Sequence, residues 1–360
     1  MRPIPSLLNE QLIRPEWTGL VKRENNFLWL DKNENLDSEY LTWINSHVAR
    51  NIDPIDLSTY PDLGGLYSDL GKLDDIDPHN IFLSTGSDGA IRTVFHSFVE
   101  PGDKVFITNP SIAMYDVYCK IFSADIVYVD YNNKEGVITM DIDNLQKQIR
   151  DIKPKLVCIP NPDSPTGTIL SETEIISIHD ACLSANAVLF IDEAYYPFHD
   201  YSVINLIKSG RKDLVLCRTF SKAWGLAGIR VGSLIADYEM ISIMNKLRPM
   251  YEIGSLPLKI THLVLKHQNQ MLSSVKSIME GKQYFENAMN TAGFQTIKTY
   301  GNFSHVKFDK SRSSIFENLD KFVYYRKDFA HVCLKGYTRF SSAPVTIMKQ
   351  VVDAINSSIL

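Results

Sequence analysis

The middle of the chain contains five short runs of consecutive apolar residues, separated by stretches with helical patterning. The runs do not alternate with polar residues, which is typical of strands that are buried on both faces of a parallel sheet. They occupy residues 105–108, 156–160, 188–191, 214–217 and 231–235. This pattern predicts an α/β fold with a mostly parallel central sheet that is covered by helices.

The two ends of the chain have a different pattern. Residues 257–292 have the periodicity of one long amphipathic helix, and strands are expected near 303–308, 322–326 and 337–341. At 360 residues the chain is long enough for one large and one smaller domain. We predict a large cofactor-binding domain at 46–250, and a smaller α+β domain built from both chain ends, 1–45 and 251–360.

The composition narrows the class of protein. A formal net charge of -5 gives no electrostatic reason to expect binding to nucleic acid. No stretch has the length and apolarity of a membrane span or a signal peptide. The histidines lack metal-ligand spacing, and the five cysteines are widely spaced in apolar runs, as in a reduced cytosolic protein. We expect a cytoplasmic protein that binds neither membrane, nucleic acid nor metal.

Polar residues follow three of the predicted strands, at the sheet edge where parallel sheets bind ligands. Residues 84–90 are a glycine turn that leads into a helix, which is either an ordinary N-terminus or a phosphate site. Residues 160–167 contain prolines and a glycine, which indicates either a tight turn or a rigid loop that positions side chains. Asp192 ends a buried strand, and either it caps the next helix or a cation such as a protonated pyridine nitrogen satisfies it.

The stretch at 218–232 surrounds one lysine, Lys222, with apolar and small residues. Such surroundings, with other cations nearby, lower the pKa of a lysine and make its neutral amine available as a Schiff-base nucleophile. The hydroxyls of Thr219 and Ser221 and the guanidinium of Arg230 are suited to bind a phosphate. A lysine on the surface at a helix start is the alternative. Lysine and phosphate ligands together indicate pyridoxal 5′-phosphate, whose aldehyde needs the amine.

These features occur in a defined order, with Asp192 25 positions after Gly167 and Lys222 30 positions after Asp192. From Leu30 to about Pro344 the chain resembles the fold-type I pyridoxal-phosphate aminotransferases of classes I and II, and most closely histidinol-phosphate aminotransferases and their relatives. The strongest motif is Arg-Thr-Phe-Ser-Lys-Ala-Trp-Gly-Leu-Ala-Gly-Ile-Arg, where that family has Arg-Thr-Leu-Ser-Lys-Ala-Phe-Gly-Leu-Ala-Gly-Leu-Arg.

The resemblance implies three catalytic residues. Lys222 is expected to form the Schiff base and to move the substrate proton, Asp192 to pair with the pyridine nitrogen, and Tyr195 to donate a hydrogen bond to the ring oxygen of the cofactor.

The resemblance also implies binding residues. In a homodimer, Tyr60 would reach the phosphate of the neighbouring subunit. Three residues are expected to bind the acidic groups of the substrate: Asn33, Arg326 and Arg339. The cofactor-binding residues expected within one chain, besides the catalytic three, are Ser87, Asp88, Ile112, Ser164, Thr219, Ser221 and Arg230.

Two departures from the family pattern concern the cofactor ring. Ser164 stands where the family has an asparagine that donates to the ring oxygen, so that oxygen would rely more on Tyr195. Ile112 stands where the family has an aromatic side chain stacked on the ring, and Tyr115 and Tyr118 are the rings available on the following helix. On the substrate side, Glu-Ile-Gly-Ser at 252–255 replaces the family's more polar Asn-Val-Asn-Ser.

The resemblance implies amino transfer from an amino acid, with glutamate as the expected donor, to a phosphorylated ketone. Candidate acceptors are imidazole-acetol phosphate and the smaller dihydroxyacetone phosphate. Decarboxylation of a phosphorylated amino acid, of the threonine-phosphate or serine-phosphate type, is the alternative, because the same cofactor serves both reactions. A regulator or an inactive scaffold is disfavoured, since Lys222 is intact and neither end carries a basic helix-turn-helix extension.

Overall fold

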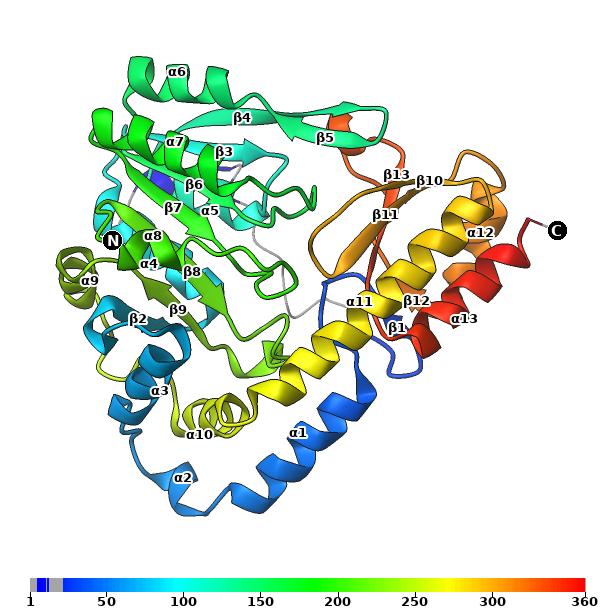
Figure 1. The fold of residues 1–360 in the computed structure, drawn as a ribbon, viewed down its shortest axis with the longest axis horizontal. Coiled ribbons are helices and arrows are strands. Elements are labelled where there is room, and N and C mark those ends of the chain that lie inside the picture. Colours follow the sequence, from blue (N-terminus) through cyan, green and yellow to red (C-terminus); the bar gives the residue numbers. More distant parts are fainter. Residues whose placement is uncertain (1–4, 11, 13–21, 360) are drawn as a thin grey trace.

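A computed structural model describes residues 5–10, 12 and 22–359 of the chain. Its centre is an eight-stranded sheet, called the large sheet below (Figure 1). In spatial order its strands are β2 (Ile81–Ser84), β9 (Gly232–Ile235), β8 (Leu214–Thr219), β7 (Val188–Asp192), β6 (Leu156–Pro160), β3 (Lys104–Asn109), β4 (Asp125–Lys134) and β5 (Val137–Met140). The predicted α/β class with a mostly parallel central sheet is confirmed.

One predicted strand runs in the unexpected direction. The pairs β3/β4, β3/β6, β6/β7 and β7/β8 are parallel, but β9 is antiparallel to both β8 and β2. The expectation that the apolar run at 231–235 forms a parallel strand is therefore wrong. The segment that joins β8 to β9, residues 220–231, contains only the short 3-10 helix Ala227–Ile229, and it lacks the α-helix that usually carries the chain across a sheet to a parallel neighbour.

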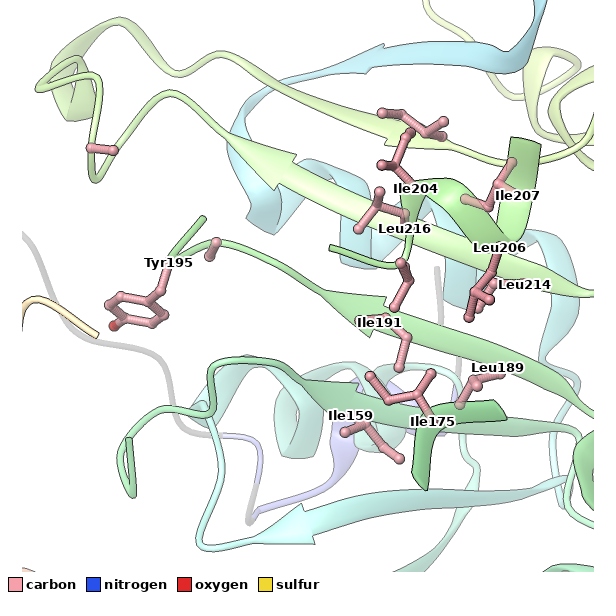
Figure 2. Close-up of a cluster of buried hydrophobic side chains, with 14 of the residues drawn as sticks. Ile159, Ile175, Leu189, Ile191, Tyr195, Ile204, Leu206, Ile207, Leu214 and Leu216 are labelled. Atoms are coloured by element: carbon pink, nitrogen blue, oxygen red, sulfur yellow. The ribbon is translucent and has the colours of Figure 1, made fainter. Parts of the chain in front are cut away.

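The central strands are apolar along their whole length because both faces of the large sheet are covered. Alternate side chains belong to two separate cores. One core contains Leu189 and Ile191 of β7 and side chains from α3 (Gly64–Asp74), α6 (Ile142–Ile152), α7 (Glu172–Ser184) and α8 (Ile204–Lys208). Figure 2 shows aliphatic side chains of this core, with Tyr195 beyond the end of β7. The other core contains Phe190 of β7 and side chains from α4 (Gly86–Phe98), α5 (Ala113–Ile121) and α9 (Tyr238–Asn245).

A second, three-stranded antiparallel sheet is called the small sheet below. Its order is β10 (Gln295–Ile297), β11 (Phe303–Lys307) and β13 (Tyr337–Ser341). One face packs on α11 (Gln268–Thr291) and α13 (Val345–Asn356), where Val306 and Phe340 meet Phe285. The long helix expected at 257–292 is two helices, α10 (Ser255–Leu265) and α11, because the backbone leaves the helical region at His267 (φ -126, ψ 42).

A segment near the N-terminus and one near the C-terminus meet beside the small sheet. β1 (Leu28–Trp29) pairs in parallel with β12 (Val323–Tyr324), which follows α12 (Arg312–Leu319) along the chain. Helix α1 (Ser38–Asn51), followed by α2 (Ile55–Ser58), contributes Tyr40 and Ile44 to a core of the large sheet. The domain boundaries at 45/46 and 250/251 stay a prediction, and residues 1–4, 11, 13–21 and 360 lie outside the described part.

Among the helices of residues 5–10, 12 and 22–359, none has the length and apolarity needed to cross a membrane. Nor do the described side chains include a group of three or more His, Cys, Asp or Glu that is arranged to hold a metal ion.

Candidate active site

The predicted catalytic aspartate lies at the end of β7, inside the protein. Asp192 shares a face of the large sheet with Val188 and Phe190, and it is 1% exposed. The backbone N–H of Ala194 donates to its Oδ1 (2.9 Å), and the hydroxyl of Tyr115 donates to its Oδ2 (3.2 Å). Burial raises the pKa of Asp192 to about 6, although these two hydrogen bonds and the charge of Lys222 act in the other direction.

A buried carboxylate with this environment fits a cationic ring nitrogen. None of the described Lys, Arg or His side chains forms an ion pair with Asp192, so its charge lacks a direct counter-ion among them. Burying an unpaired charge costs free energy, and a protonated ring nitrogen would recover that cost. The geometry supports pairing of Asp192 with a cationic ring better than a role as a helix cap, because no helix starts within three residues of it.

Lys222 and Tyr195 lie close together on the substrate side. The Nζ atom of Lys222 lies 5.8 Å from the centre of the Tyr195 ring and donates to the backbone carbonyl of Lys32 (2.7 Å). The side chain of Asn33 donates to the Tyr195 hydroxyl (2.8 Å). The predicted nucleophile, the predicted ring-oxygen donor and a predicted substrate ligand therefore form one cluster.

The predicted phosphate ligands surround the start of α4. Thr219 donates to Ser221 (3.0 Å between oxygens), and the guanidinium of Arg230 lies 3.4 Å from the Ser221 hydroxyl. Gly86, the first residue of α4, has φ +74, and a Cβ added to it would lie 2.6 Å from Nη2 of Arg230. A cation, two hydroxyls and a helix N-terminus therefore converge where only glycine fits, which suits a phosphate.

The two residues after Gly86 were also predicted as phosphate ligands. Both Ser87 and Asp88 are half-buried in the first turn of α4. The carboxylate of Asp88 accepts a hydrogen bond from Tyr118 (3.1 Å). Because an ionised carboxylate cannot donate to a phosphate, only the backbone N–H of Asp88 is suited to that role.

The first residue of the 218–232 motif holds this region in place. The side chain of Arg218 is 12% exposed and forms ion pairs with Asp74 and with Glu193. Its guanidinium also lies 4.1 Å from the centre of the Tyr196 ring. Burial alone would lower the pKa of Arg218, but the charges of Asp74 and Glu193 raise it. This network ties β8 to α3 and to the loop after β7, so the residues that follow Arg218 start from a fixed position.

The loop after β6 is organised around a residue that the sequence analysis did not single out. Asp163 is fully buried and accepts hydrogen bonds from the backbone N–H (3.0 Å) and hydroxyl (2.6 Å) of Thr166, and from Thr108 (3.2 Å). Burial raises its pKa to about 6. Ser164, predicted next to the ring oxygen, is 7% exposed in this loop.

The structure excludes both candidate substitutes for the stacking ring. Ile112 lies at the N-terminal end of α5, half-buried against the core. Tyr115 is fully buried in that core, where its hydroxyl reaches Asp192, and Tyr118 bonds Asp88. The suggestion that one of these tyrosines supplies the missing ring is therefore wrong, since α5 directs both into the layer beneath the sheet. Ile112 is the only one of the three side chains that is not buried there.

Two of the three predicted anion ligands lie at the small sheet: Arg339 is in β13, and Arg326 pairs with it through an isolated bridge. Arg339 on β13 is 6% exposed, and its Nη2 donates to the backbone carbonyl of Asp31 (2.9 Å). Arg326 is exposed and joins the same strand through backbone hydrogen bonds with Arg339. Burial, together with the charge of Arg326, lowers the pKa of Arg339. Among the described residues, no carboxylate forms an ion pair with either arginine.

Tyr60 lies apart from the other predicted site residues. It is 78% exposed, and its ring stacks on Tyr251 with 4.4 Å between ring centres. Met250, next to Tyr251, is 86% exposed. Within one chain, therefore, Tyr60 does not take part in the cluster around Lys222.

Three residues of this site escaped the sequence analysis: Asp163 and Gly86 in the roles described above, and Asn302, whose side-chain amide donates to the backbone carbonyl of Asn33 (3.1 Å). Gly86 lies in the turn that was predicted, so a requirement for positive φ could have identified it. Asp163 takes two hydrogen bonds from Thr166, three residues further on, so an aspartate turn in the predicted loop could have identified it. Asn302 has no local signal, because Asn33 is distant in sequence.

Comparison with known proteins identifies the family. A family model for aminotransferases of classes I and II matches residues 59–355. A histidinol-phosphate aminotransferase from Ruminiclostridium cellulolyticum is 32% identical over 350 residues, which cover 93% of this chain and 91% of that relative. Another, from Caldanaerobacter subterraneus, is 30% identical over 309 residues and covers 84% and 86%.

Solved structures show the same fold. The histidinol-phosphate aminotransferase of Sinorhizobium meliloti, in complex with pyridoxal-5′-phosphate, has a TM-score of 0.81 at 21% identity, over 92% of this chain and 90% of that chain. The L-threonine-O-3-phosphate decarboxylase of Porphyromonas gingivalis has 0.75 at 20%, over 92% and 99%. The chain belongs to the class I and II aminotransferases, as its sequence predicted, and it is a pyridoxal-phosphate-dependent enzyme close to the histidinol-phosphate aminotransferases.

Proposed function

We propose that this enzyme moves the amino group of glutamate to a small ketone that carries a phosphate. The observation that supports this choice is the pair of arginines on the small sheet. Arg339 is buried and has no acidic partner within the described part of the chain, and Arg326 places a second positive charge near it. A buried cation of this kind is costly unless an anionic ligand pairs with it. Two guanidinium groups suit a dianionic phosphate, and a single guanidinium can also bind the carboxylate of the amino donor through two parallel N–H groups.

The residues around Lys222 would hold the cofactor, which supplies an aldehyde for the amine and a ring that withdraws electrons from the substrate. The carboxylate of Asp192 would keep the ring nitrogen protonated. Tyr195, oriented by Asn33, would donate to the ring oxygen. Ser164 would lie beside the ring oxygen and Ile112 against the ring. The cofactor phosphate would bind Thr219, Ser221, Arg230, Ser87 and the backbone N–H of Asp88.

Lys222 would have two tasks. Its amine would attach the cofactor covalently, and after the substrate displaces it, the free amine would move the proton from the substrate carbon. Its present hydrogen bond to the carbonyl of Lys32 keeps the Nζ atom on the substrate side, close to Tyr195. The anion ligands Arg339, Arg326 and Asn33 would orient the substrate, which selects the bond that is broken.

We also propose a cytoplasmic homodimer in which Tyr60 reaches the cofactor phosphate of the neighbouring subunit. Its exposure, together with that of Met250 and Tyr251, is what a contact surface between copies would provide. Tyr60→Phe should then weaken cofactor binding, although Tyr60 does not contact the cluster around Lys222 of its own chain. Unchanged affinity in a protein that sediments as a dimer would contradict this role.

The acceptor is tested with the holoenzyme. Added glutamate should transfer its amino group to the bound cofactor, which changes the visible absorbance. Phosphorylated ketones should then take up that amino group and restore the starting spectrum. Dihydroxyacetone phosphate and imidazole-acetol phosphate are the first two to compare, with dihydroxyacetone as the matched control without phosphate. We expect the unphosphorylated ketone to have a kcat/KM lower by about a hundredfold or more.

Two results would overturn the proposal. One is a cofactor spectrum that glutamate and other amino donors leave unchanged while phosphothreonine or phosphoserine releases carbon dioxide, which would establish the decarboxylase alternative. The other is equal kcat/KM for the ketones with and without phosphate, which would remove the phosphate from the substrate class.

A further inference from the structure

His305 lies directly opposite Arg339 in the small sheet. The two residues are register partners in the antiparallel pair of β11 and β13, so their side chains lie on the same face. The rings of Phe303 and Phe329 flank both of them. The guanidinium carbon of Arg339 lies 5.4 and 5.9 Å from these two ring centres, and the His305 ring lies 5.7 and 5.3 Å from them. Histidine and arginine therefore share one compartment with aromatic walls.

The proton on His305 can be assigned from the contact of its ring with the loop after β6. Its Nε2 lies 2.7 Å from the backbone carbonyl of Pro165. A carbonyl only accepts, so Nε2 carries the hydrogen. The side chain is fully buried, and burial, together with the charges of Arg339 and Lys282, lowers its pKa to about 3. The ring is therefore neutral at physiological pH, and Nδ1 presents a bare lone pair.

Two complementary groups in this compartment have no partner. Among the described residues, neither Nδ1 of His305, an acceptor, nor Nε of Arg339, a donor, makes a hydrogen bond. Leaving such buried groups unpaired costs free energy that a hydrogen bond between them would recover. At present the guanidinium is held through its Nη2 on the carbonyl of Asp31.

We propose that His305 is the positioning residue of Arg339, and this inference rests on the proposed role of Arg339 as the ligand of the substrate anion. When an anion binds the terminal N–H groups of the guanidinium, Nε–H of Arg339 donates to Nδ1 of His305, which fixes the direction of the fork. Through Nε2, the same histidine fastens the fork to the loop that contains Ser164 and Pro165. Substrate anion and cofactor loop are thereby held at a set separation.

Replacements of His305 can separate its two nitrogens. Asparagine offers an acceptor near the position of Nδ1 but no donor at the ε position, glutamine offers a donor near Nε2 but no acceptor at the δ position, and leucine offers neither. Binding of inorganic phosphate to each holoenzyme is measured by calorimetry. We expect His305→Gln and His305→Leu to weaken phosphate binding about tenfold, as for a lost hydrogen bond to a charged group, and His305→Asn to bind more tightly than either.

A kinetic readout distinguishes positioning from simple packing. In the glutamate half-reaction the KM should rise in His305→Gln, while the maximum rate changes less and the cofactor spectrum stays as in the parent. Thermal unfolding identifies any variant that fails to fold. If His305→Leu fails to fold, His305→Asn and His305→Gln still test whether Nδ1 of His305 positions Arg339.

Each outcome has one meaning. If His305→Gln binds phosphate as tightly as the parent enzyme, the acceptor at Nδ1 has no role and the inference is wrong. If Arg339→Gln loses phosphate binding while no His305 variant does, only the inference about His305 fails. If Arg339→Gln itself binds phosphate normally, the proposed anion site fails, and the role of His305 falls with it.

Discussion

The proposed cofactor site and the proposed anion site differ in how far the chain itself satisfies their polar groups. In the cofactor site, both oxygens of Asp192 accept hydrogen bonds and Thr219 donates to Ser221. The proposed anion site differs: four of the six unpaired buried side-chain atoms among the described residues lie on β11 and β13 or directly beside them, on Asn302, His305, Arg339 and Ser342.

The difference indicates that the two regions have separate roles. Groups that already have partners keep their geometry when a ligand leaves, so the cofactor site is preorganised. Groups without partners gain most when a ligand supplies the missing bonds, and they penalise a ligand that lacks them. Specificity for the substrate is therefore expected to come from the small sheet, and cofactor chemistry from the ends of β7 and β8.

Lys222→Ala tests the cofactor site and should have the largest effect. Loss of the nucleophile removes covalent attachment and the proton carrier, so turnover should fall by at least about 10²–10⁴-fold and the visible absorbance of the attached cofactor should disappear. Lys212→Ala is the control, since that exposed lysine pairs only with Glu239 on the surface. Turnover and colour retained in Lys222→Ala would refute its assignment.

Arg339→Gln tests the anion site and should separate it from the cofactor site. Losing two charge-assisted hydrogen bonds to the substrate should lower kcat/KM by about a hundredfold or more, while the cofactor spectrum is unchanged. Arg312→Gln, which removes a half-buried arginine paired with Asp328 outside the proposed site, is the matched control. If the spectrum changes as much as kcat/KM does, the two sites are not independent and the comparison breaks down.

Gly86→Ala should weaken cofactor binding about tenfold, because the added Cβ would displace the guanidinium of Arg230 from the phosphate position. Gly102→Ala is the control for backbone strain: its φ is +89, yet no atom lies within 4 Å of the added Cβ. Equilibrium dialysis with pyridoxal phosphate measures both. Equal affinities in the two variants would mean that strain alone, and not the phosphate cradle, explains the change.

Tyr115→Phe should have the smallest effect, and it should depend on pH. Cofactor affinity should fall as the pH drops through about 6, because Asp192 then takes up a proton and loses its attraction for a cationic ring. The Tyr115 hydroxyl favours the ionised form, so its removal raises the pKa of Asp192 and moves this midpoint to higher pH.

Tyr131→Phe is the control for this experiment, since its hydroxyl bonds another buried carboxylate, Asp163, away from the proposed ring partner. The affinity of each variant for pyridoxal phosphate is titrated between pH 5 and 8. An identical pH profile in Tyr115→Phe and the parent protein would show that the hydroxyl does not tune Asp192.

The sequence by itself determined the features that depend on neighbours along the chain. Continuous apolar runs indicate strands covered on both faces, and the residues that end those runs must then lie at the ligand-binding edge of the sheet. Asp192 and Lys222 could be found in this way, and the motif at 218–232 identified the family. The class of enzyme was therefore predictable without coordinates.

Only the tertiary structure decided which distant residues meet. The reversed direction of β9 follows from how β8 and β2 flank it, and the contact of Tyr115 with Asp192 joins residues 77 positions apart. The pairing of His305 with Arg339 depends on strand register, because a slip of one residue in either strand would turn that strand's side chain to the opposite face and separate the two. Local patterns specify strands and turns, but register and packing arise from contacts over the whole chain.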